Sequence, residues 1–100
     1  MQVRSFILIN GQELIAELRQ TTGRGYKIRN PLVVQVMRGP DGAPSLAFMP
    51  WSHIRLEGTE MELFDVSVAS VDEVAPDAEQ AYISQTTGIA VPAKSQIITG

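Results

Sequence analysis

The sequence has no cysteine and only one histidine, His53, among its 100 residues. Without cysteine the chain forms no disulfide and offers no thiolate, which fits a reducing compartment. With one histidine and no cluster of carboxylates at ligand spacing, no set of side chains is suited to hold a metal ion. The sequence therefore predicts neither a metal site nor a cofactor.

Long hydrophobic runs are also missing. The apolar stretch within residues 1–10 is too short for the core of a signal peptide and for a membrane span. The hydrophobic content of 44% is ordinary for a globular domain. We therefore expect one domain in the cytoplasm, without a membrane partner.

Catalytic motifs are equally scarce. Ser52 and His53 are neighbours, so on a strand they face opposite ways and do not form a nucleophile–base pair. The stretch GRGYKI begins like a dinucleotide fingerprint, but Ile28 stands where a glycine is needed, and a strand is predicted where a helix should follow. No phosphate-binding loop is present. The sequence predicts that the protein is not an enzyme.

Cationic side chains are rare in the second half of the chain. Residues 1–55 carry seven Lys and Arg against three Asp and Glu, a net charge of +4. Residues 56–100 carry Lys94 alone against eight acidic residues, a net charge of −7, so the whole chain has −3. A basic first half favours contact with a polyanion, whereas a mixed solvated surface is the simpler alternative.

The clearest pattern that is present is LINGQELIAEL, residues 8–18. Asn10–Gly11 supplies the positive φ of a tight hairpin turn between two alternating strands. Before the turn, Phe6 and Leu8 share one face. After the turn, one face holds Leu14, Ala16 and Leu18, and the opposite face holds Glu13, Ile15, Glu17 and Arg19.

Further strands are expected along the chain. Residues 26–37 form a third strand with Tyr26, Ile28, Leu32, Val34 and Val36 on one side, and Pro31 marks a bulge, an edge or a bend. Residues 46–49 form a fourth strand, Pro50 ends or kinks it, and residues 53–56 are a possible continuation. Residues 66–71 form the last strand. The intervening stretches TTGRGY and RGPDGAPS are turns or loops.

A helix follows the strands. Pro76 and Asp77 suit its start, and Ala78, Ala81, Tyr82 and Gln85 recur at helical spacing up to Gly88. The remaining tail is either partly disordered or an arm that reaches a neighbour. The predicted fold is mostly β: a small five-stranded, strongly bent antiparallel barrel over residues 1–75, with a short C-terminal helix and an extended tail over residues 76–100.

Candidate binding residues gather near the start of the third strand. The cluster combines charge for phosphate, a ring for stacking and an amide for base edges, as single-stranded nucleic-acid sites do; its members are Arg24, Tyr26, Lys27, Arg29 and Asn30. Alternatively, Tyr26 belongs to the core and Lys27 to the solvent face of the strand. Trp51 is either an exposed stacking platform or interface anchor, or a core residue that caps the barrel.

The hairpin resembles the first signature of the Sm-like (LSm) family. The matching positions are Phe6, Leu8, Asn10, Gly11, Leu14, Ala16 and Leu18, with Ala16 where the family usually has glycine. The resemblance covers about residues 3–71 and is nearest to small Sm-like proteins of marine cyanophage type, which share Asn-Pro early in the third strand and a late helix with a tyrosine. It implies a homo-oligomeric ring of about five to seven subunits, in which the fourth strand of one subunit pairs with the fifth of the next. A phage origin would place the protein in the host cytoplasm.

The sequence departs from the family at its RNA-binding positions. The loop TTGRGYKIRN ends in Asn30 but lacks the family's aspartate, and the Arg-Gly of the second signature is missing whether that signature aligns with residues 49–54 or with residues 66–71. The sequence is therefore compatible with two alternative functions. In one, a ring binds single-stranded RNA or a related nucleic acid through Arg24, Tyr26, Lys27, Asn30 and Trp51. In the other, an Sm-fold assembly or adaptor protein has lost RNA binding and meets a protein through its acidic second half.

Overall fold

The computed structural model describes residues 1–56, 58–88 and 98–99. Its elements are β1 (Gln2–Leu8), β2 (Glu13–Thr21), β3 (Gly25–Arg38), β4 (Pro44–Pro50), β5 (Glu60–Phe64), the 3₁₀ turn η1 (Asp65–Ser67), β6 (Val68–Glu73), α1 (Pro76–Thr87) and β7 (Ile98–Thr99). Strands β1 to β6 belong to one antiparallel sheet, and β7 pairs in parallel with β4. The prediction of a mostly β fold with a short C-terminal helix is confirmed.

The hairpin at Asn10–Gly11 forms as the sequence predicts. Gly11 has a φ of +90°, and the Asn10 side chain accepts a hydrogen bond from the Gln12 N–H at 3.0 Å. The two strands then pair in register from Ile7 opposite Glu13 to Gln2 opposite Leu18. This turn fixes which side chains of β1 and β2 lie on each face of the sheet.

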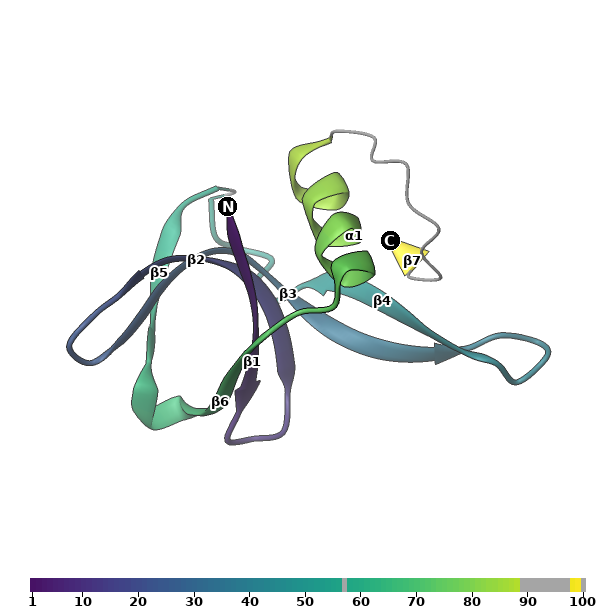
Figure 1. Cartoon of the computed structure of the whole chain (residues 1–100), viewed down its shortest axis with the longest axis horizontal. Helices are drawn as coiled ribbons and strands as arrows, with labels where there is room; N and C mark the ends of the chain where they lie inside the picture. Colours follow the sequence, from purple (N-terminus) through teal and green to yellow (C-terminus); the bar gives the residue numbers. More distant parts are fainter. Residues whose placement is uncertain (57, 89–97, 100) are drawn as a thin grey trace.

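The sheet runs in the order β6-β1-β2-β3-β4-β7, and β5 pairs with the first half of β3. Figure 1 shows this sheet strongly curved, with the second half of β3 and β4 extending to one side as a two-stranded arm. We call residues 34–38 and 44–48 the arm. No hydrogen-bonded pairing joins β6 to β4 or β5 within the described residues, so the sheet is open.

In the middle of β3 the alternation of side chains between the two faces of the sheet shifts by one residue. The prediction that its apolar residues all lie on one side is therefore wrong. Ile15 pairs with Leu32 and Glu17 with Arg29, so one extra residue of β3 is accommodated between these pairs. Asn30 takes the left-handed conformation, with φ of +52°, and Pro31 donates no ladder hydrogen bond. Tyr26 and Ile28 therefore face one core and Leu32 and Val34 the other, instead of all sharing one side.

The last predicted strand, residues 66–71, is also wrong at its start. The chain first forms β5, then turns sharply in η1, and only from Val68 does it pair with β1. Val66 lies in this turn, where its side chain is exposed. Residues 53–56 do not continue the strand: β4 ends at Pro50, and residues 53–55 form bends.

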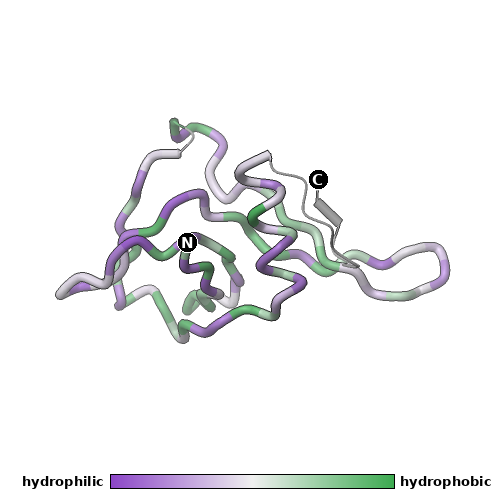
Figure 2. The backbone as a smooth tube through the Cα atoms, turned by 45° about the horizontal axis from the view of Figure 1, so that its top comes forward, coloured by the Kyte–Doolittle hydropathy of each residue, from purple (hydrophilic) through white to green (hydrophobic). Residues whose placement is uncertain are grey.

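Helix α1 covers the face of the sheet opposite the curved core. It begins with Pro76 in its first turn and ends at Gly88, whose φ is +73°. Ala81 and Tyr82 pack on one cluster with Val3, Ile15, Leu32 and Phe48. The other face buries a second cluster, made of Phe6, Leu8, Leu14, Ala16, Ile28 and Leu63. Figure 2 shows hydrophobic and hydrophilic residues alternating along the strands that supply both faces.

No helix in the described part of the chain has both the length and the apolar character needed to cross a membrane. The prediction for the tail concerns residues 89–100, of which all but Ile98 and Thr99 lie outside the described residues. Those two residues form β7 beside Ala47 and Phe48.

Candidate functional site

Arg24 lies in the turn between β2 and β3, where it is held by β5. Its Nε and Nη2 donate to the two carboxylate oxygens of Glu62 at 3.3 and 3.1 Å, and its guanidinium lies 5.2 Å from the ring centroid of Phe64. The hydrogen bond with Arg24 lowers the pKa of Glu62, and the same bond raises the pKa of Arg24. The Arg24 side chain is still 74% exposed, but its charge is balanced by a carboxylate.

Further ion pairs continue from Arg24 across the sheet. Arg19 lies 2.8 Å from Glu17 and 3.2 Å from Glu60, and Arg29 lies 3.9 Å from Glu60. Because β5 pairs with β3, carboxylates from the acidic second half of the sequence lie beside arginines of the basic first half. At this surface Glu60 and Glu62 of the second half therefore balance arginines of the first half.

Two of the predicted site residues also contribute to packing. The Tyr26 ring meets Phe6 edge-on, with centroids 5.6 Å apart, and its side chain is only partly exposed. Trp51 packs against the same core cluster, and its backbone N–H donates to the carbonyl of Pro31 at 3.3 Å. Both residues thus have a structural role, whatever else they contact.

Asn30 is positioned by a tyrosine from the helix. The Tyr82 hydroxyl lies 2.8 Å from the carbonyl oxygen of Asn30 and 3.0 Å from that of Arg29, and it accepts the N–H of Glu17 at 3.0 Å. The hydroxyl thus links backbone groups of β2 and β3 on both sides of the bulge. Burial raises the pKa of Tyr82 far above its usual range, so the hydroxyl keeps its proton as a donor.

A pocket opens beside Asn30. We call it the Asn30 pocket; its volume is about 380 Å³, and it lies between the bulge of β3, the end of β4, the loop 51–59 and the last turns of α1. The described residues that line it are Asn30, Pro31, Leu32, Pro50, Ser52, His53, Arg55, Leu56, Gly58, Thr59, Gln85 and Thr86. Its size falls within the range of small-molecule sites.

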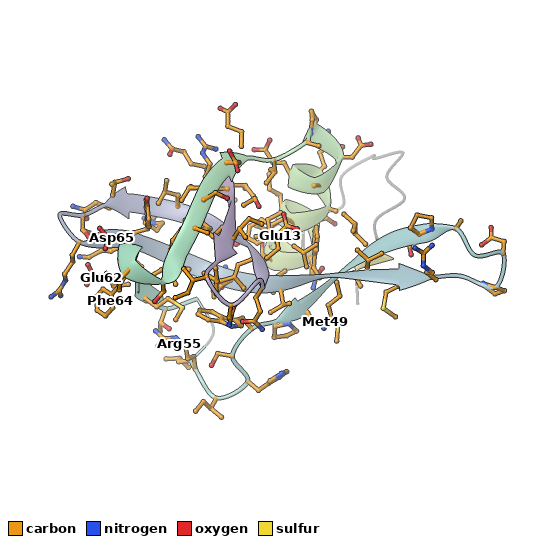
Figure 3. All side chains as sticks on the ribbon, turned by 90° about the horizontal axis from the view of Figure 1, so that it is seen from below. Glu13, Met49, Arg55, Glu62, Phe64 and Asp65 are labelled. Atoms are coloured by element: carbon orange, nitrogen blue, oxygen red, sulfur yellow. The ribbon has the colours of Figure 1, made fainter. Side chains whose placement is uncertain are left out.

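The predicted site residues therefore lie in two places: Arg24 and Lys27 beside β5, and Asn30 and Trp51 at the bulge of β3. Arg24 and Asn30 are six residues apart along extended chain, a separation of roughly 20 Å. Lys27 lies between them, paired in register with Glu62. Asn30 and Trp51 lie close together at the bulge. Figure 3 shows Glu62 and Phe64 on β5 and Arg55 on the loop that leads to it.

Sequence reasoning missed three contributors to this region. The loop residues Ser52, His53 and Arg55 line the pocket, although the sequence suggested for this loop only a kink or a continued strand. Pro50 was the available signal, because a strand that ends there leaves the following polar residues in a loop. Among the described residues, no group of three or more His, Cys, Asp and Glu is placed to hold a metal ion.

The described residues form a mostly β domain with one α-helix, and its candidate site is a pocket at the bulge of β3 with both polar and apolar lining residues. No known protein family model matches the chain, and no curated protein matches it either.

Proposed function

We propose that this chain is an Sm-like protein that assembles with copies of itself. The order of its strands supports the resemblance seen in the hairpin: after η1, strand β6 returns to pair with β1, beside the Asn10–Gly11 turn. Strong curvature of the sheet supports it as well (Figure 1). In the Sm-like arrangement such a sheet closes into a barrel and the subunits form a ring.

The arm is the observation that carries self-assembly. It exposes Val36, Met37 and, at its base, Met49, with 63%, 48% and 41% of each residue accessible. Beyond Ala47, where the pairing with β7 ends, the arm is a two-stranded ribbon, and such a ribbon with exposed apolar side chains has little stability of its own in water. Within the described residues β6 pairs only with β1, so its outer edge is free for another strand. Assembly of subunits through the arm and the edge of β6 would bury the apolar side chains of the arm and pair the free edge of β6.

Light scattering after size exclusion tests this proposal. The wild-type chain is expected to elute as one closed oligomer, and Val36→Lys with Met37→Lys is expected to reduce it to monomers. Ile54→Lys is the matched control, because Ile54 is 95% exposed but lies in the loop 51–59, away from the arm. A monomeric wild type, or an arm variant that stays assembled, would overturn self-assembly through the arm.

Binding of single-stranded nucleic acid is the second candidate function. The observation that favours it is the placement of Asn30 with His53 and Arg55 around one pocket, beside Trp51. Fluorescence anisotropy with short oligo-U and oligo-A RNA tests it. Binding that weakens as salt rises supports the function. The double variant Arg24→Ala with Lys27→Ala tests whether the β2–β3 turn and the start of β3 contact phosphates. If neither RNA binds at low salt, where electrostatic attraction is strongest, the nucleic-acid function is rejected and only the proposed self-assembly remains.

A further inference from the structure

A second cavity lies on the helix side of the sheet, apart from the Asn30 pocket. We call it the acidic groove; its volume is about 290 Å³, and its lining comes from β6, β1, β2, the arm and the start of α1. Its floor is apolar, with contributions from Ile7, Ile15 and Phe48. No Lys, Arg or His is among its described lining residues, whereas three carboxylates are: Glu13, Asp72 and Glu73.

The carboxylates of the groove have no cationic partner among the described residues of the chain. Glu13 accepts a hydrogen bond from the neutral Ser5 hydroxyl at 2.8 Å, and Asp72 stands opposite Ser5 in the pairing of β1 with β6. An apolar floor with carboxylates beside it disfavours an anion. It suits a side chain that has an aliphatic stem and a cationic head, which is a lysine or an arginine.

The arm presents such a side chain near its tip. Val34, Val36 and Arg38 alternate along β3, so all three lie on the face of the sheet that lines the groove. Arg38 is exposed, and its Nη1 donates to the carbonyl of Gly42 at 3.1 Å. Within the described part of the chain no carboxylate forms an ion pair with it. The arm thus carries an exposed valine followed by a cation without a counter-charge.

Arg38 does not meet the groove of its own chain. Val34 lines the groove, but Arg38 follows four residues later, roughly 13 Å farther along extended chain. Figure 1 shows the arm extending away from the rest of the domain. The cation and the carboxylates are therefore complementary charges on two different surfaces of the same chain, and a second copy of the chain brings them together.

We propose that the acidic groove receives the arm of a second copy, with Arg38 of that copy between Glu13 and Asp72 and its Val36 on the apolar floor. The inference rests on the proposed self-assembly and goes beyond it, because it assigns the side chains that select the partner. Complementary charges fix the register and exclude wrong partners. Because arm and groove are different surfaces, the contact is heterologous and repeats from one subunit to the next in one direction.

Charge reversal tests the contact, with light scattering after size exclusion over a range of protein concentrations. Arg38→Glu and Asp72→Arg, each alone, should raise the concentration at which the oligomer half-dissociates by about tenfold or more. The double variant Arg38→Glu with Asp72→Arg again places opposite charges between neighbouring subunits. It should assemble at nearly the wild-type concentration, which two unrelated surface changes would not achieve.

Two control variants make the same charge changes elsewhere. Arg55→Glu and Asp65→Arg alter exposed residues outside the arm and the groove, and both should assemble as the wild type does. Arg38→Gln addresses the hydrogen bond to Gly42, because it keeps an amide donor for that carbonyl and removes only the charge. It should weaken assembly as well, and assembly equal to that of the wild type would overturn the role of the charge.

The outcomes separate this contact from self-assembly in general. A monomeric wild type overturns both proposals. An oligomer that Val36→Lys with Met37→Lys dissociates, but that Arg38→Glu and Asp72→Arg leave intact, overturns the arm-in-groove contact alone. If each single reversal dissociates the oligomer and the double variant stays monomeric, the two side chains do not face each other, and the contact is again overturned.

Discussion

The Tyr82 hydroxyl forms hydrogen bonds with the backbone of β2 and β3 at the bulge. Its removal is therefore expected to lower the stability of the fold. In Tyr82→Phe the N–H of Glu17 loses its acceptor in a buried site, and the Asn30 carbonyl loses a donor. The free energy of unfolding should fall by about 1–3 kcal/mol, measured by urea denaturation. Tyr26→Phe is the control, since no hydrogen bond engages that hydroxyl among the described residues. Equal losses in the two variants would contradict the role of Tyr82.

The ion pair of Glu62 and Arg24 predicts a pH dependence. Because the folded pKa of Glu62 lies below its ordinary value of 4.5, the pair stabilises the fold above that value and is lost as pH falls through the lowered one. The difference in stability between wild type and Glu62→Gln should therefore be larger at pH 7 than in strong acid. Urea midpoints across this range measure it. A difference that does not change with pH would show that the pair contributes nothing in solution.

At the scale of elements, Gly25 allows β5 to lie against β3. A Cβ at this position would collide with the backbone oxygen of Leu63. Gly25→Ala should therefore force the two strands apart and destabilise the fold by about 1–3 kcal/mol. Gly23→Ala is the matched control in the same turn, since a Cβ there meets nothing within 4 Å. Thermal unfolding of both variants checks the contrast, and similar melting temperatures would contradict close packing at Gly25.

The sequence predicts those elements whose signals are local. The hairpin at Asn10–Gly11 and the helix from Pro76 to Gly88 both follow from turn and cap residues, and both form as expected. The face change at Asn30 does not follow from alternation, because a single left-handed residue shifts the period and leaves no mark on the hydrophobic pattern. Pro31 indicated an irregularity there without fixing its direction.

The candidate site was harder to predict than the fold, because it depends on contacts between distant segments. Arg24 and Lys27 were predicted as cations for phosphate, but the pairing of β3 with β5 places Glu62 beside both. Asn30 was predicted for a binding role, and the structure puts it on a pocket wall with loop residues some twenty positions away. Which carboxylate meets which arginine is a property of the tertiary fold and not of sequence spacing.

At the scale of the whole molecule, the carboxylates of β5 pair with Arg19 of β2, Arg24 of the β2–β3 turn and Arg29 of β3. Glu60→Gln with Glu62→Gln would change the net charge from −3 to −1. The substitutions remove the carboxylates that pair with Arg24 and Arg29, whereas Arg19 keeps its pair with Glu17. If single-stranded RNA contacts this surface, the affinity for oligo-U at low salt should rise. The slope of log affinity against log salt should also steepen by about 0.7 for each phosphate newly engaged.

Anisotropy over a salt series measures both quantities. An unchanged oligo-U affinity together with an intact oligomer would mean that this surface does not meet polyanions even when its arginines are released. The remaining role of the ion pairs would then be to hold β5 on β3, with assembly through the arm as the function of the molecule.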